Sequence, residues 1–178
     1  MKNNVSFQAT KVSAPSSSAK ELVVRRLNWK DVKETTEWQT ARNFCDSNGM
    51  KSWKLETTEQ NDPVDIRAKS ADGKSVEEFQ IVRLWEQVDW EKLNTKNAVD
   101  RNYEDQEAVE LFRKALERKG PKKYSADVRK NLVLLIDANP IESVSQFTAG
   151  IESTIRAFAK VGYKSVWVVG TGDSRRID

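Results

Sequence analysis

The stretch NDPVDIRAKSADGKSVEEFQIV, residues 61–82, decides the fold prediction, because it contains two strand-like segments joined by a turn signal. Residues Val64–Lys69 and Val76–Leu84 are predicted strands. Asp72-Gly73 between them is a pair typical of a two-residue β-hairpin turn, whose positions both need positive φ. With the turn at these two residues, the numbers of directly opposed residues add up to 145. The sequence therefore predicts an antiparallel hairpin of fixed register.

In this register, five polar side chains share one face of the hairpin. Asp65 is opposite Gln80, Arg67 is opposite Glu78, and Lys69 lies on the same face. The other face is the expected core side and carries Val64, Ile66, Phe79 and Ile81.

The two acids on the polar face, Asp65 and Glu78, form a diagonal pair. Directly opposed Cβ atoms lie about 5 Å apart and diagonal ones roughly 7 Å apart, so both carboxylates could reach one cation. Two like charges this close repel each other unless a divalent ion or Arg67 lies between them. The polar face therefore predicts either a metal site or a solvated ladder in which Arg67 pairs with Glu78.

The composition restricts the chemistry that such a site can use. The chain has 178 residues, a net charge of +3, one cysteine (Cys45) and no histidine. The lack of histidine excludes histidine-containing triads, histidine metal sites and histidine general bases. A single cysteine excludes an internal disulfide framework and a cysteine zinc cluster. Hydrolytic chemistry would therefore need carboxylates, lysines and a hard metal bound by oxygen.

The remaining sequence predicts one α/β domain over residues 18–170, preceded by a flexible leader (1–17) and followed by a polar tail (171–178). The expected elements are, in order, one or two helices between residues 18 and 48, strands at 53–57, 64–69 and 76–84, a helix at 104–118, a strand at 131–137, a helix at 141–160 and a strand at 165–169. The last two strands are continuously apolar, which is typical of strands covered on both faces.

The hairpin and this order of elements resemble the PD-(D/E)xK nuclease superfamily. The segment Asn61-Asp-Pro-Val-Asp65, a short strand, a glycine-containing turn and then Glu78-Phe-Gln80 look like the motif of that family in an ExQ form. The resemblance covers most of residues 18–170. It implies a restriction-endonuclease-like α/β fold with an αβββαβ core, in which helices flank a mixed central sheet.

The same resemblance implies a role for each motif residue. Asp65 and Glu78 would bind Mg²⁺, which Mn²⁺ could replace, together with the Phe79 carbonyl. Gln80 would occupy the position of the family's lysine, where an uncharged amide could orient a water by hydrogen bonding while the metal lowers the pKa of that water. The resemblance also allows a supporting acid from the first helix, Glu21, and Glu56 beside the first strand could reach the metal. Lys54 and Lys69, on or beside the hairpin, would supply the missing positive charge. Glu21 is also explained as part of a helix cap, and Glu56 as a surface charge.

A basic cluster around Gly120-Pro121 is a candidate for contacts with nucleic acid. Its members are Lys119, Lys122, Lys123, Arg129 and Lys130. Phosphate contacts need such side chains, but a solvated loop uses them too, so the cluster alone leaves both interpretations open.

Together these patterns predict a Mg²⁺-dependent endodeoxyribonuclease that hydrolyses DNA phosphodiester bonds, and a homodimer would suit an enzyme that cuts two strands. The alternative is a catalytically inactive module of the same fold that binds nucleic acid or a protein partner, which Gln80 favours. A third is an interaction domain with no role on nucleic acid.

The chain lacks the ~18 consecutive apolar residues of a membrane span and an apolar stretch typical of a signal peptide, so we expect no membrane contact and a cytoplasmic location.

Overall fold

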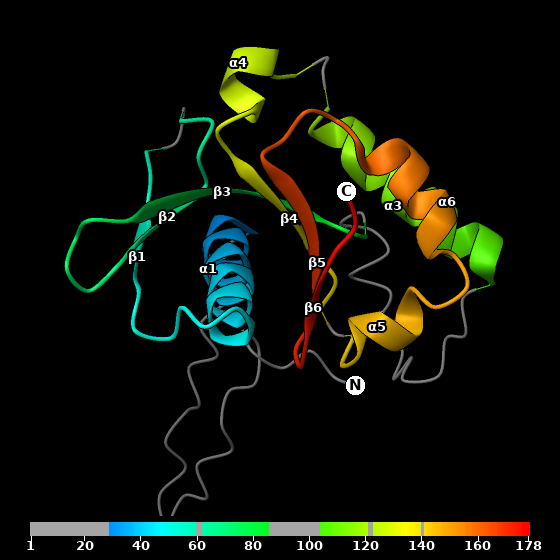
Figure 1. Cartoon of the computed structure of the whole chain (residues 1–178), viewed down its shortest axis with the longest axis horizontal. Coiled ribbons are helices and arrows are strands. Elements are labelled where there is room, and N and C mark those ends of the chain that lie inside the picture. Colours follow the sequence, from blue (N-terminus) through cyan, green and yellow to red (C-terminus); the bar gives the residue numbers. More distant parts are fainter. Residues whose placement is uncertain (1–28, 60–61, 86–103, 121–122, 140) are drawn as a thin grey trace, which may run out of the picture.

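The computed structural model describes residues 29–59, 62–85, 104–120, 123–139 and 141–178, with side chains described from residue 35 onward. These residues form a mixed α/β fold of six strands in one sheet and five helices (Figure 1). The elements are, in chain order, α1 (Trp29–Ser47), β1 (Lys54–Thr57), β2 (Ile66–Lys69), β3 (Val76–Arg83), α3 (Asp105–Arg118), α4 (Ala126–Arg129), β4 (Val133–Asp137), α5 (Val144–Phe147), α6 (Glu152–Ala159), β5 (Ser165–Val169) and β6 (Ser174–Arg176). The predicted α/β class with a mixed sheet is confirmed.

The sheet keeps its strands in chain order, from β1 at one edge to β6 at the other. β1, β2 and β3 form an antiparallel meander, β3, β4 and β5 run parallel, and β6 returns antiparallel to β5. Figure 1 shows β1 and β2 on the left, and α3 and α6 side by side on the right. β3 is therefore the strand shared by the antiparallel and parallel parts. In the described part of the chain, no helix combines the length and apolar character needed to cross a bilayer.

The predicted hairpin register is confirmed, because Ile66 pairs with Phe79 and Arg67 with Glu78. The turn is longer than predicted: Ser70 and Ser75 close it with a 2.9 Å hydrogen bond, and Gly73 takes a φ of 71°. In the predicted two-residue turn, only Asp72 and Gly73 would lie between the last paired residues of the two strands. In the structure four residues, 71–74, lie between the paired serines.

The structure differs from the prediction at the other end of the hairpin, where β2 begins at Ile66 instead of Val64. The Asp65 amide donates to the Phe79 carbonyl (2.8 Å), and the Asp65 carboxylate accepts from the Ile81 amide (2.7 Å). The side chain of Asp65 thus takes the place of a backbone partner for β3. The strand pairing therefore ends before Asp65 and Gln80 can pair.

The sheet separates two hydrophobic clusters. One lies against α1, where Phe44 packs edge-on against Phe79 with ring centroids 5.3 Å apart. It contains Ala41, Phe44, Cys45, Ile66, Ala68, Phe79, Ile81, Val133, Leu135 and Val169. This confirms the expected core side for Ile66, Phe79 and Ile81, but Val64 belongs to the other cluster because the chain changes course at Asp65.

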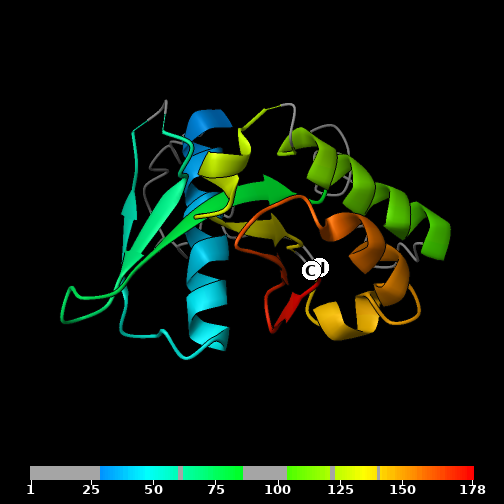
Figure 2. The same ribbon diagram turned by 45° about the horizontal axis from the view of Figure 1, so that its top comes forward.

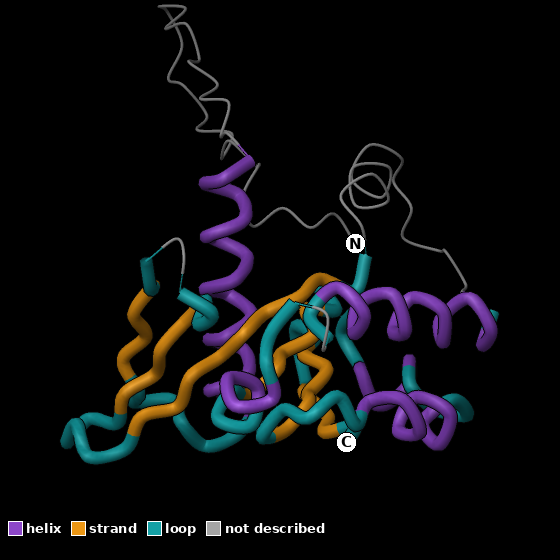
Figure 3. Tube along the Cα trace, turned by 90° about the horizontal axis from the view of Figure 1, so that it is seen from above, coloured by secondary structure: helices purple, strands orange, loops and turns teal. Residues whose placement is uncertain are grey.

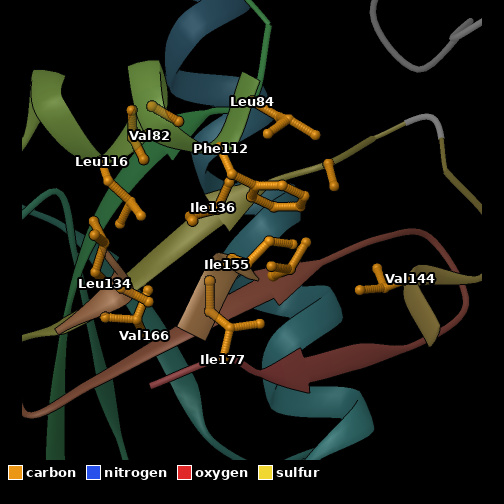
Figure 4. Close-up of a cluster of buried hydrophobic side chains, with 14 of the residues drawn as sticks. Val82, Leu84, Phe112, Leu116, Leu134, Ile136, Val144, Ile155, Val166 and Ile177 are labelled. Carbon is orange, nitrogen blue, oxygen red and sulfur yellow. The ribbon is translucent and has the colours of Figure 1, made fainter. Parts of the chain in front are cut away.

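The second cluster lies between the opposite face of the sheet and helices α3 and α6 (Figure 4). Its central members are Val82, Leu84, Phe112, Leu116, Leu134, Ile136, Ile155, Val166, Val168 and Ile177. Figure 3 shows α1 well separated from α3 and α6. Alternation along β3 and β4 sends successive side chains to the two clusters, and so explains why β4 is buried at every position and apolar from Val133 to Ile136, with the buried Asp137 at its end.

Residues 171–178, predicted as a polar tail, are instead part of the fold. They contain β6, and Ile177 is completely buried in the cluster beside α3 and α6. Asp173 accepts hydrogen bonds from the amides of Val144 (2.5 Å) and Ser145 (3.1 Å) and thereby caps α5. The helix predicted at 141–160 is interrupted at Gly150, whose φ of 82° separates α5 from α6.

Gly170, which follows β5, makes a close backbone approach to the segment before α5. A Cβ atom at this position would collide with the Ile141 carbonyl oxygen and lie 2.9 Å from Val144 Cγ2. We expect Gly170→Ala to lower the free energy of unfolding by about 1–3 kcal/mol, the usual cost of forcing an atom into packed structure, as measured by urea denaturation. Gly73→Ala is the comparison, since a Cβ there meets nothing within 4 Å and only the left-handed φ of 71° opposes it, at about 1 kcal/mol. Equal midpoints for Gly170→Ala and the wild type would contradict the close approach.

Candidate metal and nucleic-acid site

Two of the predicted site residues, Asp65 and Gln80, lie where the end of α3 and the loop between α6 and β5 meet the hairpin. Figure 2 shows the tip of the β2–β3 hairpin projecting past α1 on the side away from α3. Along β3, Glu78 and Gln80 alternate onto the same face as Val82, which packs in the cluster beneath α3. The polar face of the hairpin thus continues directly into the face that α3 and α6 cover.

Asp65 lies at the base of this polar face and is held from two directions. Its Oδ2 atom accepts a 2.7 Å hydrogen bond from the Ile81 amide and lies 3.3 Å from the Nζ atom of Lys119. The Asp65 and Lys119 side chains are only 16 % and 12 % exposed, respectively. An ion pair so shielded from water is stronger than one on the open surface.

Glu78 makes an ion pair with Arg67 across the strands. Arg67 donates from Nε (2.9 Å) and from its terminal nitrogen (2.7 Å), and both contacts fall on Oε1 of Glu78. Both side chains are about one-third exposed, so the pair itself contributes ~0–1 kcal/mol to stability. The ladder predicted as one of the two outcomes for this face is therefore present.

Gln80 is completely buried, and both ends of its amide bind protein groups. Nε2 donates to the Pro63 carbonyl (2.7 Å), and Oε1 accepts from the Tyr163 hydroxyl. The same hydroxyl lies 2.8 Å from the Lys119 carbonyl oxygen. Gln80 is thus close to the Asp65–Lys119 ion pair, but its hydrogen bonds tie the surrounding segments together. That Gln80 orients a metal-bound water remains a prediction.

Phe79 contributes nothing to this face except its backbone. The ring lies in the α1 cluster, and the carbonyl accepts the hydrogen bond from the Asp65 amide (2.8 Å). A carbonyl oxygen has a second lone pair, so this bond still leaves an acceptor site.

The two lysines predicted to supply a positive charge bind elsewhere. Lys69 lies 2.7 Å and Lys54 3.9 Å from the Glu56 carboxylate. The hydrogen bond from Lys69 is the main reason that the pKa of Glu56 is lowered from its ordinary value. These three residues form an ion-pair group on β1 and β2. The predicted acid Glu21 lies outside the described residues.

Lys119, predicted only as a member of the basic cluster, is instead the lysine at the candidate site. No pattern in the sequence joins Lys119 to the hairpin. Lys119 caps the end of α3, and the structure brings its Nζ to 3.3 Å from Asp65 and its carbonyl to the Tyr163 hydroxyl, which also contacts Gln80.

The other members of the basic cluster differ in their surroundings. Arg129 is buried and donates from Nε to the Tyr124 carbonyl (3.0 Å), and Lys130 pairs with Asp127 at 2.7 Å. Lys123 is exposed, lies 5.5 Å from the centre of the Tyr124 ring and has no ion pair with any residue that the structure describes. Lys122 lies outside those residues. Lys123 is therefore the described member best placed to bind a phosphate.

The candidate site offers two carboxylates, Asp65 and Glu78, and carboxylate oxygens are ligands that Mg²⁺ prefers. Across residues 35–59, 62–85, 104–120, 123–139 and 141–178, no three His, Cys, Asp or Glu side chains gather closely enough to hold a metal. Mg²⁺ is commonly held by one or two carboxylates, with water and phosphate oxygens completing its shell. Within the same ranges, Oδ1 of Asp65 and Oε2 of Glu78 accept no hydrogen bond, since the bonds recorded fall on Oδ2 and Oε1. Each acid thus keeps one oxygen for a cation.

No family model matches the chain, and neither a curated protein nor a solved structure matches it significantly.

Proposed function

We propose that this protein is a Mg²⁺-dependent nuclease with a restriction-endonuclease-like core, which hydrolyses DNA phosphodiester bonds. The observation that carries the proposal is the lysine beside the motif: Lys119 Nζ lies 3.3 Å from Asp65 Oδ2, in a shielded position next to Gln80. Lys119 would take the role that the resemblance gives to a lysine at position 80. The order of elements, three antiparallel strands after α1 and then alternating helices and parallel strands, supports the same proposal.

In this proposal Asp65 and Glu78 would hold Mg²⁺, or Mn²⁺ in its place, through the oxygens that protein donors leave unoccupied. The ion, when bound, would supply a Lewis acid that stabilises negative charge on the phosphoryl oxygens. The Ile81 amide fixes Oδ2 of Asp65, and Arg67 fixes Oε1 of Glu78, so both carboxylates are oriented before any ligand arrives.

Lys119 would act on the phosphate directly. Its ammonium group is positively charged and largely excluded from water, and a fixed charge in such a place stabilises developing negative charge more strongly than a solvated one. Lys123, which is exposed, would contact the DNA backbone nearby and add to affinity without selecting a sequence.

The proposal is tested by cleavage of supercoiled plasmid DNA by the purified protein. We expect nicked or linear products with Mg²⁺ or Mn²⁺, and intact plasmid when EDTA is present. Plasmid that stays intact at millimolar concentrations of both metals would overturn the nuclease proposal.

A second candidate function is a non-catalytic module that binds nucleic acid or a protein partner. The observation that favours it is the Arg67–Glu78 ion pair, which neutralises the acid at 2.7 Å without a metal, together with the complete burial of Gln80. A nucleic-acid-binding module would retain plasmid in a filter-binding assay. Its affinity would fall steeply as the salt concentration rises from about 50 to about 200 mM, with a slope set by the number of phosphates that it contacts. The predicted homodimer and cytoplasmic location belong to the same proposals.

A further inference from the structure

Tyr163, in the loop between α6 and β5, makes two hydrogen bonds that join distant parts of the candidate site. Its buried hydroxyl lies 2.8 Å from the Lys119 carbonyl oxygen and also contacts Oε1 of Gln80. The orientation of the Gln80 amide is fixed by its other end, because the Pro63 carbonyl 2.7 Å away requires an N–H donor. The oxygen of Gln80 therefore faces Tyr163.

A tyrosine hydroxyl has one proton, yet here two acceptors share it. Among the residues that the structure describes, Tyr163 alone donates a hydrogen bond to the Lys119 carbonyl and to Oε1 of Gln80. Burial raises the pKa of Tyr163 well above its ordinary value, so the hydroxyl keeps its proton at physiological pH. Without that proton, two buried acceptors would lose their partner at once.

The position of these bonds along the chain links them to Asp65. Lys119 follows the last residue of α3, so its carbonyl marks where the helix stops, and its side chain reaches Asp65 from that point. The Pro63 carbonyl that Gln80 binds lies two residues before Asp65. One hydroxyl thus holds both segments that carry the ion pair.

We propose that Tyr163 is a positioning residue, which sets the place of the Lys119 ammonium group against Asp65 by holding the end of α3 to Gln80. The effect on cleavage rests on the proposed nuclease function, whereas the effect on the position of Lys119 does not.

The position of Lys119 is tested by trace labelling with acetic anhydride, read for each lysine by mass spectrometry. In the wild type we expect Lys119 to react far more slowly than the exposed Lys130 and Lys160. Tyr163→Phe should increase the labelling of Lys119 several-fold and leave the two exposed lysines unchanged. Tyr124→Phe is the matched control, since it removes a hydroxyl from the other tyrosine near Lys119, whose ring centre lies 5.9 Å from Nζ, and it should not change the labelling. Unchanged labelling of Lys119 in folded Tyr163→Phe would overturn the proposal.

A second variant covers the case in which Tyr163→Phe does not fold. Gln80→Met removes the acceptor on β3 to which the Tyr163 hydroxyl holds the end of α3, so the labelling of Lys119 should rise several-fold, as in Tyr163→Phe. Unchanged labelling of Lys119 in folded Gln80→Met would reject the proposal.

The role in cleavage is tested by a double-mutant cycle. We expect Tyr163→Phe to slow Mg²⁺-dependent cleavage by about 10-fold in the wild-type background, because a small displacement of an acting group is costly, and to have no further effect in Lys119→Met. An equal loss in both backgrounds would mean a purely structural role. If the wild type does not cut DNA at all, the nuclease proposal fails, and the labelling result still decides the positioning role of Tyr163.

Discussion

Glu78→Gln should reduce Mg²⁺-dependent cleavage on the order of 10³-fold, equivalent to about 4 kcal/mol of transition-state stabilisation. The substitution keeps the shape of the side chain and leaves Oε1 able to accept from Arg67, which lies 2.7–2.9 Å away in the wild type. It removes the negative charge that a divalent cation needs and replaces the unoccupied Oε2 with an NH₂ group, which cannot bind a metal. Initial rates of plasmid nicking at saturating Mg²⁺ give the measurement.

The matched control is Glu77→Gln, at the neighbouring position of β3. Glu77 also forms an ion pair, with Lys164 at 2.7 Å, but alternation turns its side chain to the opposite face of the strand. This variant loses the same charge, so any general effect of charge on DNA binding should appear in both. We expect it to cut DNA within about 2-fold of the wild type, as surface changes away from a site usually have small effects. Equal losses in the two variants would remove Glu78 from the site.

Lys119→Met should reduce cleavage by about 10²–10³-fold, the loss that follows removal of one preorganised donor from an active site. Methionine fills similar volume without a charge, and Asp65 keeps the hydrogen bond from the Ile81 amide at 2.7 Å, so the fold should survive. Far-UV circular dichroism checks the fold, and single-turnover cleavage with excess enzyme measures the chemical step without the influence of substrate affinity.

Lys123→Met provides the comparison for this variant. Lys123 is exposed and lies beside the same Tyr124 ring, but it has no recorded contact with Asp65. Its loss should weaken DNA binding modestly and reduce the salt dependence of binding by about one phosphate contact, with single-turnover cleavage unchanged. A Lys119→Met enzyme that cuts as fast as Lys123→Met would leave the site without its lysine and would favour the non-catalytic module.

The register of the hairpin could be predicted from sequence because the information is local. A glycine-containing turn and the alternation of side chains act within about 20 residues, and the pairing of Arg67 with Glu78 follows from them. The end of the pairing could not be predicted in this way. It depends on the carboxylate of Asp65 taking the Ile81 amide as a partner, and alternation rules treat side chains as if they made no bonds to the strand backbone.

The residues that complete the candidate site were beyond local reasoning for a different reason. Lys119 and Tyr163 come from segments 54 and 83 residues away from their partners Asp65 and Gln80, so no short-range pattern links them. β6 was missed because three residues are too few to show a periodicity, and its neighbour Ile177 is a single apolar residue within a polar stretch. In each case tertiary contacts determine the outcome.

The division of the interior by the sheet has a practical meaning for redesign of this protein. Among the described residues, none is shared between the cluster under α1 and the cluster under α3 and α6, and the Glu78 and Gln80 side chains alternate onto the face of β3 that carries Val82 of the second cluster. Sequence libraries restricted to the α1 side, at positions such as Ala41, Cys45 and Val133, can therefore search for thermal resistance without touching the residues proposed to act on DNA. The two sides of the sheet can be treated as separate engineering problems.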